Sequence, residues 1–460
     1  MKKICISAER VYVLRVFTVK NKFKKQLKVK DFKKMSNPVS LIIIGAGGRG
    51  TGYANLIKAL GDRATVTAVA EPRDFQRNRI GDMFNIPEER RFRCWSEVAK
   101  LPKFADAVCI CTQDAMHEEP AIAFAKLGYH MLLEKPMAPT ADACRRIVAA
   151  VKEAGVIFAV CHVLRYTTYT RALKKVLDSG TIGKVVSMQH LESVAHWHQA
   201  HSFVRGNWRN EKESSFMLLA KCCHDVDWIR YMMDRPCDEV QSFGSLEHFR
   251  AENQPEGAGD RCTECPAGIE CTCPYSAMKI YLRDRLFKGL KGWPTDVITD
   301  DLTTEGVLKA LKEGPYGRCV YKCDNDVVDH QVVNMKFNDG CTAQMEMTAF
   351  SDIGRFTRFF GTKGTVTGDG QLITIHRYVN SDPTDVTINQ EVIDTNVAND
   401  GGILSGHGGG DGGIIDSFVY ALETGDRSAI LSGTDETLES HLMTFAAEDS
   451  RRKGQVQKVQ

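Results

Sequence analysis

Short apolar runs alternate with longer amphipathic stretches between residues 39 and 160. The apolar runs read SLIII, TVTAVA, AVCIC and YHMLL, and a last run, VIFAVCHV, closes the region. Runs of this length are typical of strands buried on both faces, and the amphipathic stretches between them are typical of helices. The alternation therefore predicts βαβ units, in which a parallel sheet carries helices on both of its faces.

Three glycines follow the first apolar run and precede the first amphipathic stretch. Gly45, Gly47 and Gly50 form the pattern G-x-G-x-x-G, which permits a tight turn and lets a pyrophosphate approach a helix N-terminus. Glu71 follows the next apolar run, where a carboxylate accepts hydrogen bonds from a ribose 2′-hydroxyl. The pattern predicts a dinucleotide-binding Rossmann domain and favours NAD over NADP, with Arg73 as an alternative partner for a 2′-phosphate.

A second motif follows the run YHMLL. Glu134, Lys135 and Pro136 stand where this strand is expected to end. In an open α/β sheet, ligands bind outside the carboxyl ends of the strands, and a proline restricts the backbone there. We therefore expect Lys135 to face a bound ligand; the alternative is an ordinary solvated charge at the end of a strand.

The pattern changes after residue 160. Two β-rich runs surround Asn338-Asp339-Gly340, a sequence typical of a hairpin, and two helical segments close the chain. We expect an NAD-binding Rossmann domain over residues 35–160 and a substrate-binding α+β domain with an open, mostly antiparallel sheet over 161–460. A segment rich in Cys, Gly and Pro, about 250–330, reads as an insertion in the second domain.

The charge of the chain is unevenly distributed. Residues 1–34 carry 12 Lys and Arg against 2 Asp and Glu, whereas the remainder is mildly acidic. We interpret 1–34 as a basic extension that is disordered or not native, with Met35 as an alternative start of translation. The acidic body predicts no nucleic-acid partner. No apolar run approaches the roughly 18 residues that cross a membrane, so we expect a cytoplasmic protein without a membrane partner.

These motifs together resemble the Gfo/Idh/MocA oxidoreductases. The matching segments are GAGGRG at 45–50, CTQDAMH ending in His117, EKP at 134–136, Arg165-Tyr166, SGTIGKV at 179–185, and His224 with Asp227. The resemblance implies a Rossmann domain joined to an open-sheet substrate domain, with Lys135 beside the nicotinamide and the substrate hydroxyl and a cis bond to Pro136. The cofactor contacts that it implies are Gly45, Gly47, Arg49, Gly50, Glu71, Thr112, His117, Glu134 and Lys135.

The stretch AKCCHDVD at 220–227 lies in a segment, 215–233, that we expect to form one helix. On a helix, Lys221, His224 and Asp227 share a face. By resemblance, His224 takes the substrate hydroxyl proton, helped by Lys135. The family's acid partner of this histidine falls at Ala220, so the proton relay is altered, and Lys221 is a candidate to replace it.

Further side chains are candidates for the substrate site. His198 and His201 lie in AHWHQAHSF, and we predict that they contact a sugar beside the aromatic face of Trp197; a metal triad with His196 and solvent-facing histidines are alternatives. His407 lies in a glycine-rich segment that could reach the same place. The set that we assign to the substrate is Arg165, Tyr166, His198, His201, Lys221 and Asp227.

Four cysteines cluster in the insertion, at Cys262, Cys265, Cys271 and Cys273. We expect the insertion to lack a core of its own, so a structural zinc ion would stabilise it. Reduced, unligated thiols and an iron–sulfur cluster are alternatives. Cys319, Cys323 and His330 are further candidates for a fourth ligand.

The sequence thus predicts an NAD-dependent oxidoreductase that acts on a secondary hydroxyl of a sugar, glycoside or cyclitol. Two alternatives stay open. One is a glycosidase that oxidises, eliminates, adds water and reduces again with the same NAD. The other is a non-catalytic regulator that binds NAD. The open sheet also leads us to expect a homo-oligomer.

Overall fold

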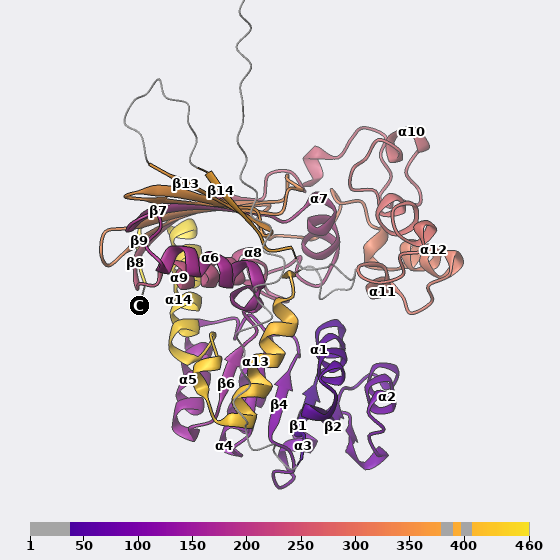
Figure 1. Cartoon of the computed structure of the whole chain (residues 1–460). Helices are drawn as coiled ribbons and strands as arrows, with labels where there is room; N and C mark the ends of the chain where they lie inside the picture. Colours follow the sequence, from indigo (N-terminus) through magenta and orange to yellow (C-terminus); the bar gives the residue numbers. More distant parts are fainter. Residues whose placement is uncertain (1–36, 379–389, 397–406, 460) are drawn as a thin grey trace, which may run out of the picture.

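The computed structural model describes residues 37–378, 390–396 and 407–459. The basic extension at 1–34 lies outside these residues. Two sheets organise the described part of the chain, with a layer of helices between them (Figure 1).

The first sheet is parallel and has six strands in the order β3-β2-β1-β4-β5-β6. Its strands are the apolar runs of the first third of the chain, which are buried because helices cover both faces. The chain order reverses between β1 and β4, and this is the point where ligands bind in sheets of this kind. The strands are β1 Val39–Ile44, β2 Ala64–Ala70, β3 Arg91–Phe92, β4 Ala107–Ile110, β5 His130–Leu133 and β6 Phe158–Val160.

The helices of this domain begin and end at expected signals. Thr140 caps α5 by accepting a hydrogen bond from the Ala143 N–H, and Gly155 ends it in the left-handed conformation. The bounds are α1 Gly48–Ala59, α2 Asp74–Met83, α3 Trp95–Ala99, α4 Glu118–Lys126 and α5 Ala141–Ala154.

The second sheet has nine strands in the order β14-β13-β12-β11-β7-β10-β9-β8-β15. β7 and β10 run parallel and the other neighbours run antiparallel, which confirms the expected mostly antiparallel open sheet. The expected hairpin joins β9 and β10, with Gly340 at φ +84° in its turn. The strands are β7 Val185–Ser193, β8 Cys237–Ser245, β9 His330–Phe337, β10 Thr342–Thr348, β11 Arg355–Gly361, β12 Gly364–Gly368, β13 Leu372–Arg377, β14 Gln390–Asp394 and β15 Gln457–Lys458.

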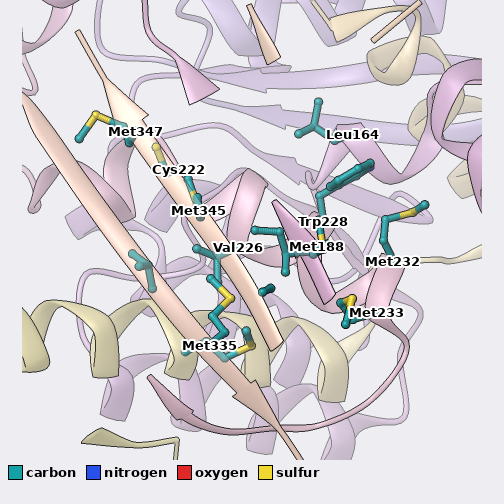
Figure 2. Packing of buried hydrophobic residues seen from close by; sticks show 14 of the residues in the cluster. Leu164, Met188, Cys222, Val226, Trp228, Met232, Met233, Met335, Met345 and Met347 are labelled. Carbon is teal, nitrogen blue, oxygen red and sulfur yellow. The ribbon is translucent and has the colours of Figure 1, made fainter. Parts of the chain in front are cut away.

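Helices pack against one face of this sheet. Figure 2 shows sulfur-rich side chains from the strands meeting apolar side chains of α9 and its neighbours. Methionine suits such a contact because its flexible side chain fills irregular gaps. The labelled residues are Leu164, Met188, Cys222, Val226, Trp228, Met232, Met233, Met335, Met345 and Met347. The helices of this domain are α6 Thr168–Asp178, α7 His196–His198, α8 Met217–Ala220, α9 Cys223–Met233, α13 Gly410–Thr424 and α14 Thr434–Lys453.

The last two helices tie the domains together. α13 returns to the first domain and packs on α1 and β1, where Ile414, Ile415 and Phe418 join its apolar core. α14 runs from the nine-stranded sheet to α5 (Figure 1). The C-terminal segment is therefore shared between both cores, and it brings residues near 407–411 to the nucleotide-binding side.

The insertion forms a lobe at the side of the molecule (Figure 1). Its helices are α10 Ala267–Glu270, α11 Thr295–Ile298 and α12 Thr304–Glu313. Tyr281, Val307 and Leu311 are fully buried in an apolar cluster that the insertion shares with Ala200 and Val204, so the lobe is packed around a core that extends into the rest of the domain. Within the described part of the chain, no helix is both long enough and apolar enough to cross a membrane.

Candidate functional site

The glycine motif lies between β1 and α1, as expected. Gly45 has φ +88°, and a Cβ there would lie 2.7 Å from the carbonyl oxygen of Cys111. A Cβ on Gly50 would overlap the carbonyl oxygen of Gly45. A Cβ on Gly47, in contrast, would meet only the guanidinium of Arg73, at 3.7 Å. The protein itself therefore requires the first and third glycines, and the second leaves open space where a pyrophosphate fits.

Glu71 stands at the end of β2 and points back at this loop. Its carboxylate accepts a hydrogen bond from the backbone N–H of Ala46 (2.8 Å) and another from Nε of Arg73 (2.7 Å). Burial works against the charged form of Glu71, but these hydrogen bonds outweigh it and lower its pKa. The result is a charged acceptor at the position where a ribose hydroxyl would bind.

We expect Glu71→Ala to shift cofactor preference from NAD toward NADP. The substitution removes the acceptor for the 2′-hydroxyl, removes a charge that repels a 2′-phosphate, and frees Arg73. The ratio of the two dissociation constants, measured by quenching of tryptophan fluorescence, should change by about tenfold or more, as expected for loss of a hydrogen bond to a charged group. Asp82→Asn, on the exposed side of α2, is the control. An unchanged ratio in Glu71→Ala would contradict this role.

A chain of ion pairs links the glycine loop to the end of β5. Arg49, in the first turn of α1, contacts Glu134 (Nε to Oε1, 2.6 Å) and Asp411 (Nη2 to Oδ1, 2.5 Å). The hydroxyl of Tyr53 donates to Glu134 at 2.7 Å. Burial raises the pKa of Glu134, but the charge of Arg49 and the Tyr53 hydrogen bond outweigh this and lower it overall. Arg49 and Glu134, both predicted cofactor contacts, thus hold each other in place.

The turn after β5 is held from two sides. The buried ring of His117 places Nδ1 2.8 Å from the carbonyl oxygen of Pro136 and Nε2 3.1 Å from that of Thr112. On the other side, Nε2 of His441 accepts a hydrogen bond from the N–H of Met137 at 2.8 Å. The Lys135–Pro136 peptide bond is cis, as the resemblance implies. His117 and Thr112 therefore support the lysine turn, and their predicted contact with the cofactor stays a prediction.

Lys135 and His224 lie close together between the two domains. Nζ of Lys135 donates to the carbonyl oxygen of Ala220 at 2.9 Å, at the end of the short helix that precedes His224. His224 is 4% exposed, and its Nδ1 has no hydrogen-bond partner among the described residues. Burial, reinforced by the charge of Lys135, holds the pKa of His224 well below its usual value. The imidazole is therefore neutral at neutral pH and able to accept a proton.

This lowered pKa predicts the acid limit of activity. A base must be neutral to accept a proton, and His224 becomes charged only when the pH falls through its own, lowered pKa. The acid limb of kcat/KM should therefore lie below pH ~6.5, the ordinary value for histidine. A pH–rate profile of the purified protein measures it. An acid limb at or above that value would show that another group carries the proton.

The expected helix 215–233 is interrupted, which is a correction to the sequence interpretation. α8 ends at Ala220 and α9 begins at Cys223, so Lys221 does not share a helical face with His224. Nζ of Lys221 instead contacts Glu192 on β7 at 2.7 Å. The ammonium of Lys221 is thus paired with a buried carboxylate, while Lys135 binds the carbonyl of Ala220. Cys222 and Cys223, on either side of the start of α9, are buried.

Sequence reasoning missed the ionic network around this break. Arg355 of β11 contacts Glu192 at 3.0 Å and Asp225 at 2.6 Å, and Asp225 accepts a hydrogen bond from His190 at 2.9 Å. Arg355 also contributes to the lowered pKa of His224, after burial and closer charges. Its partners come from β7 and α9, far away in the chain, so no local pattern could have indicated it.

Three predicted substrate residues have their polar groups bound inside the protein. Arg165 and Asp227, both fully buried, form a two-point ion pair at 2.7 and 2.8 Å. Ser440 adds a hydrogen bond to Asp227, and the hydroxyl of Tyr166 lies 2.9 Å from that of Ser432. These contacts join the domains at the start of α14. They give Arg165, Tyr166 and Asp227 a structural role, and their predicted contact with substrate stays a prediction.

The two predicted sugar-contacting histidines lie in different surroundings. His198 stacks on Trp197 and meets the edge of Trp293, with ring centres 5.7 and 5.0 Å apart, and the charges of Lys221 and Lys135 contribute, after burial, to its lowered pKa. It therefore borders the site. His201 bonds to the hydroxyl of Tyr281 at 2.7 Å and also meets the edge of Trp293, with ring centres 5.6 Å apart, and its predicted contact with a sugar stays a prediction. His196 is bound to Asp352, so the three histidines do not converge.

His407 does reach the site. Its ring centre lies 5.6 Å from that of His224, and its Nδ1 donates to Asp411 at 2.8 Å. Asp411 in turn is held by Arg49. The sequence suggested His407 only through its glycine-rich neighbourhood, and nothing in the local pattern indicated its partners.

The cysteines of the insertion do not form the expected set of four. Cys262, Cys265, Cys273 and Cys319 line one cavity of about 30 Å³, whereas Cys271 is exposed and faces the carbonyl of Gly268. Across the described ranges, no three His, Cys, Asp or Glu side chains stand close enough to hold a metal ion. Structural zinc therefore stays a prediction, which elemental analysis of the purified chain tests.

Comparison with known proteins agrees with this architecture. Residues 39–162 match the model of an oxidoreductase family with an NAD-binding Rossmann fold, and 174–459 match the C-terminal alpha/beta domain of the same family. Among solved structures, levoglucosan dehydrogenase in complex with NADH and levoglucosan shares 18% identity with a TM-score of 0.63, over 92% of this chain and 100% of that one.

Curated relatives match over part of their length. The 2,7-anhydro-N-acetylneuraminate hydratase of Escherichia coli is 27% identical over 45% of this chain and 53% of its own. The myo-inositol 2-dehydrogenase of Thermotoga maritima is 27% identical over 44% of this chain and 58% of its own. The matches thus span about half of these relatives. The two family models, however, cover nearly all of the described chain, and the protein belongs to the Gfo/Idh/MocA oxidoreductase family.

Proposed function

We propose that this protein is an NAD-dependent oxidoreductase that removes a hydride from a secondary hydroxyl of a sugar, glycoside or cyclitol. The observation that carries the proposal is the proximity of Lys135 and His224 at the carboxyl edge of the parallel sheet: Lys135 donates to the carbonyl of Ala220, and its charge helps to lower the pKa of the neutral imidazole of His224. The names of its relatives, which include an inositol dehydrogenase and an anhydrofructose reductase, support this substrate class.

The cofactor site fits NAD. Gly47 leaves room for the pyrophosphate, and Glu71 offers a charged acceptor for the adenosine ribose. Bound NAD would supply the hydride acceptor. Lys135 would hold the substrate oxygen and stabilise its developing negative charge, and His224 would take the hydroxyl proton. The cis turn, held by His117 and His441, keeps Lys135 in position for this task.

The test is the absorbance of reduced nicotinamide when the purified chain is mixed with NAD and a panel of free sugars, cyclitols and aryl glycosides. NADH should accumulate with at least one free polyol. Tight binding of NAD without reduction by any member of the panel would instead support the regulator.

A second candidate is favoured by the hydratase relatives. An enzyme of that kind would oxidise the sugar transiently, eliminate an oxygen substituent, add water and reduce the product with the same cofactor. The names of two relatives, both 2,7-anhydro-N-acetylneuraminate hydratases, support it. Release of an aglycone, or hydration of an anhydro bond, without net NADH would identify this reaction.

We also propose that the protein forms a homo-oligomer through the open face of its nine-stranded sheet. Large apolar side chains are exposed on several strands of this sheet, namely Val186, Phe243, Phe356 and Leu372. Exposed apolar side chains on an open sheet favour association with a second copy. Light scattering on the purified chain should give a mass of at least twice 51.2 kDa.

A further inference from the structure

Two imidazoles share the site, and they are supported differently. His224 has no partner at its buried Nδ1 among the described residues. His407, with its ring centre 5.6 Å away, donates from Nδ1 to Asp411 at 2.8 Å. A carboxylate on one ring nitrogen fixes the tautomer and the orientation of a histidine that transfers protons. Of the two, His407 has that group.

The orienting carboxylate is itself firmly held. Asp411 is fully buried at the start of α13, and Arg49 contacts its second oxygen at 2.5 Å. Burial disfavours its charge, but Arg49 and the hydrogen bond from His407 outweigh burial and lower its pKa. Because Nδ1 of His407 carries the proton that is donated to Asp411, Nε2 keeps a lone pair that can accept a proton. The imidazole therefore has the arrangement of a general base.

Charged or titratable groups from four elements face this ring. They are Asp411 of α13, Arg49 of α1, Arg355 of β11 and, as a second imidazole, His224 of α9. Burial lowers the pKa of His407, Asp411 raises it, and the two guanidinium groups lower it, with a net decrease. His407 is thus neutral at neutral pH and can accept a proton.

Removal of a hydride from one hydroxyl requires one base, and Lys135 with His224 already supplies it. A second oriented base at this separation can reach the neighbouring position of a sugar ring while the first serves the hydroxyl. A ketone made at the first position acidifies the C–H bond next to it. The site therefore contains one more proton acceptor than a simple dehydrogenase uses.

We propose, on the basis of the function proposed above, that His407 is a second proton-transfer residue that removes the proton from the substrate carbon next to the oxidised one. The nicotinamide cofactor is the oxidant that makes the ketone. The C–H bond then breaks, its proton goes to Nε2 of His407, and its electron pair forms a C=C bond. The C–O bond one carbon further on breaks, and the leaving oxygen takes a proton from solvent. The substrate class is a sugar or cyclitol with an oxygen leaving group at that position.

The experiment follows deuterium from solvent into the substrate. The full chain is incubated in D2O with NAD and the polyol or glycoside that gives the largest NADH signal, and the recovered substrate is analysed by NMR. The wild type should incorporate deuterium at the carbon next to the carbinol. His407→Asn should lower the incorporation per NADH formed by about 100-fold or more, the usual contribution of a positioned base. Asp411→Asn, which keeps the shape but loses the charge, should lower it as well.

Matched controls separate proton transfer from structural damage. His196 is also bound to an aspartate, Asp352, but lies at the surface. His196→Asn should therefore leave the deuterium incorporated per NADH formed unchanged. Added imidazole should restore exchange in His407→Ala, which a purely structural role would not allow. A ratio within about threefold of wild type in His407→Asn overturns the proposal. NADH formation without deuterium incorporation in the wild type also overturns the role of His407 but leaves the proposed dehydrogenase activity intact. The absence of both NADH and deuterium would overturn both proposals.

Discussion

Lys135→Met is expected to lower kcat/KM with the best polyol substrate by about 10²–10⁴-fold, the range for loss of a positioned acid–base group. Methionine keeps the length of the side chain but removes the ammonium that binds the substrate oxygen. It also removes the hydrogen bond to the carbonyl of Ala220. The measurement is the initial rate of NADH formation.

The control for this prediction is Lys221→Met. Lys221 is close in space, but its ammonium is bound to Glu192, so the loss of activity should be smaller than that of Lys135→Met. The dissociation constant of NAD, measured on both variants, shows whether the cofactor site is intact. Equal losses in the two variants, or a Lys135→Met protein within tenfold of wild type, would contradict the role of Lys135.

Asp227→Asn is expected to lower the free energy of unfolding by about 3–5 kcal/mol. Arg165 and Asp227 are both fully buried, and the amide would leave the guanidinium without its buried counter-charge. The ion pair joins the segment after β6 to α9, and Ser440 connects it to α14. Urea denaturation followed by circular dichroism measures the change.

The control is a second ion pair of Arg165, which is partly exposed. Glu436 also contacts Arg165, at 2.6 Å, but its side chain is 53% exposed. Glu436→Gln should therefore cost at most about 1 kcal/mol, as exposed ion pairs usually do. A loss in Asp227→Asn no larger than that in Glu436→Gln would show that the buried pair contributes little to stability.

Much of the fold could be predicted because its signals are local. The glycines at 45, 47 and 50, the capping Thr140 and the hairpin at Asn338-Asp339-Gly340 act through backbone conformation within a few residues. The apolar periodicity separated strands from helices in both domains for the same reason. The family resemblance then placed Lys135 and His224, which the structure brings together.

The contacts that the sequence did not indicate have one feature in common: they join residues that are far apart in the chain. Lys221, at the break in the helix, pairs with Glu192, and Arg165 pairs with Asp227; neither partner is close in sequence. The apolar cluster of the insertion likewise takes in Ala200, Val204 and Ala349 from outside it. Pairing of this kind costs or gains several kcal/mol, enough to override a local helical pattern.

The sequence by itself determined the two-domain architecture, the nucleotide loop and the lysine turn, because each rests on short-range backbone geometry and on the period of apolar residues. Only the tertiary structure decided which charged groups work together. His407 comes from the C-terminal part of the chain, Arg49 from the first helix and His224 from the middle, and they meet because α13 packs back on α1. Charges and imidazoles interact through space, so their roles emerge only when the chain is folded.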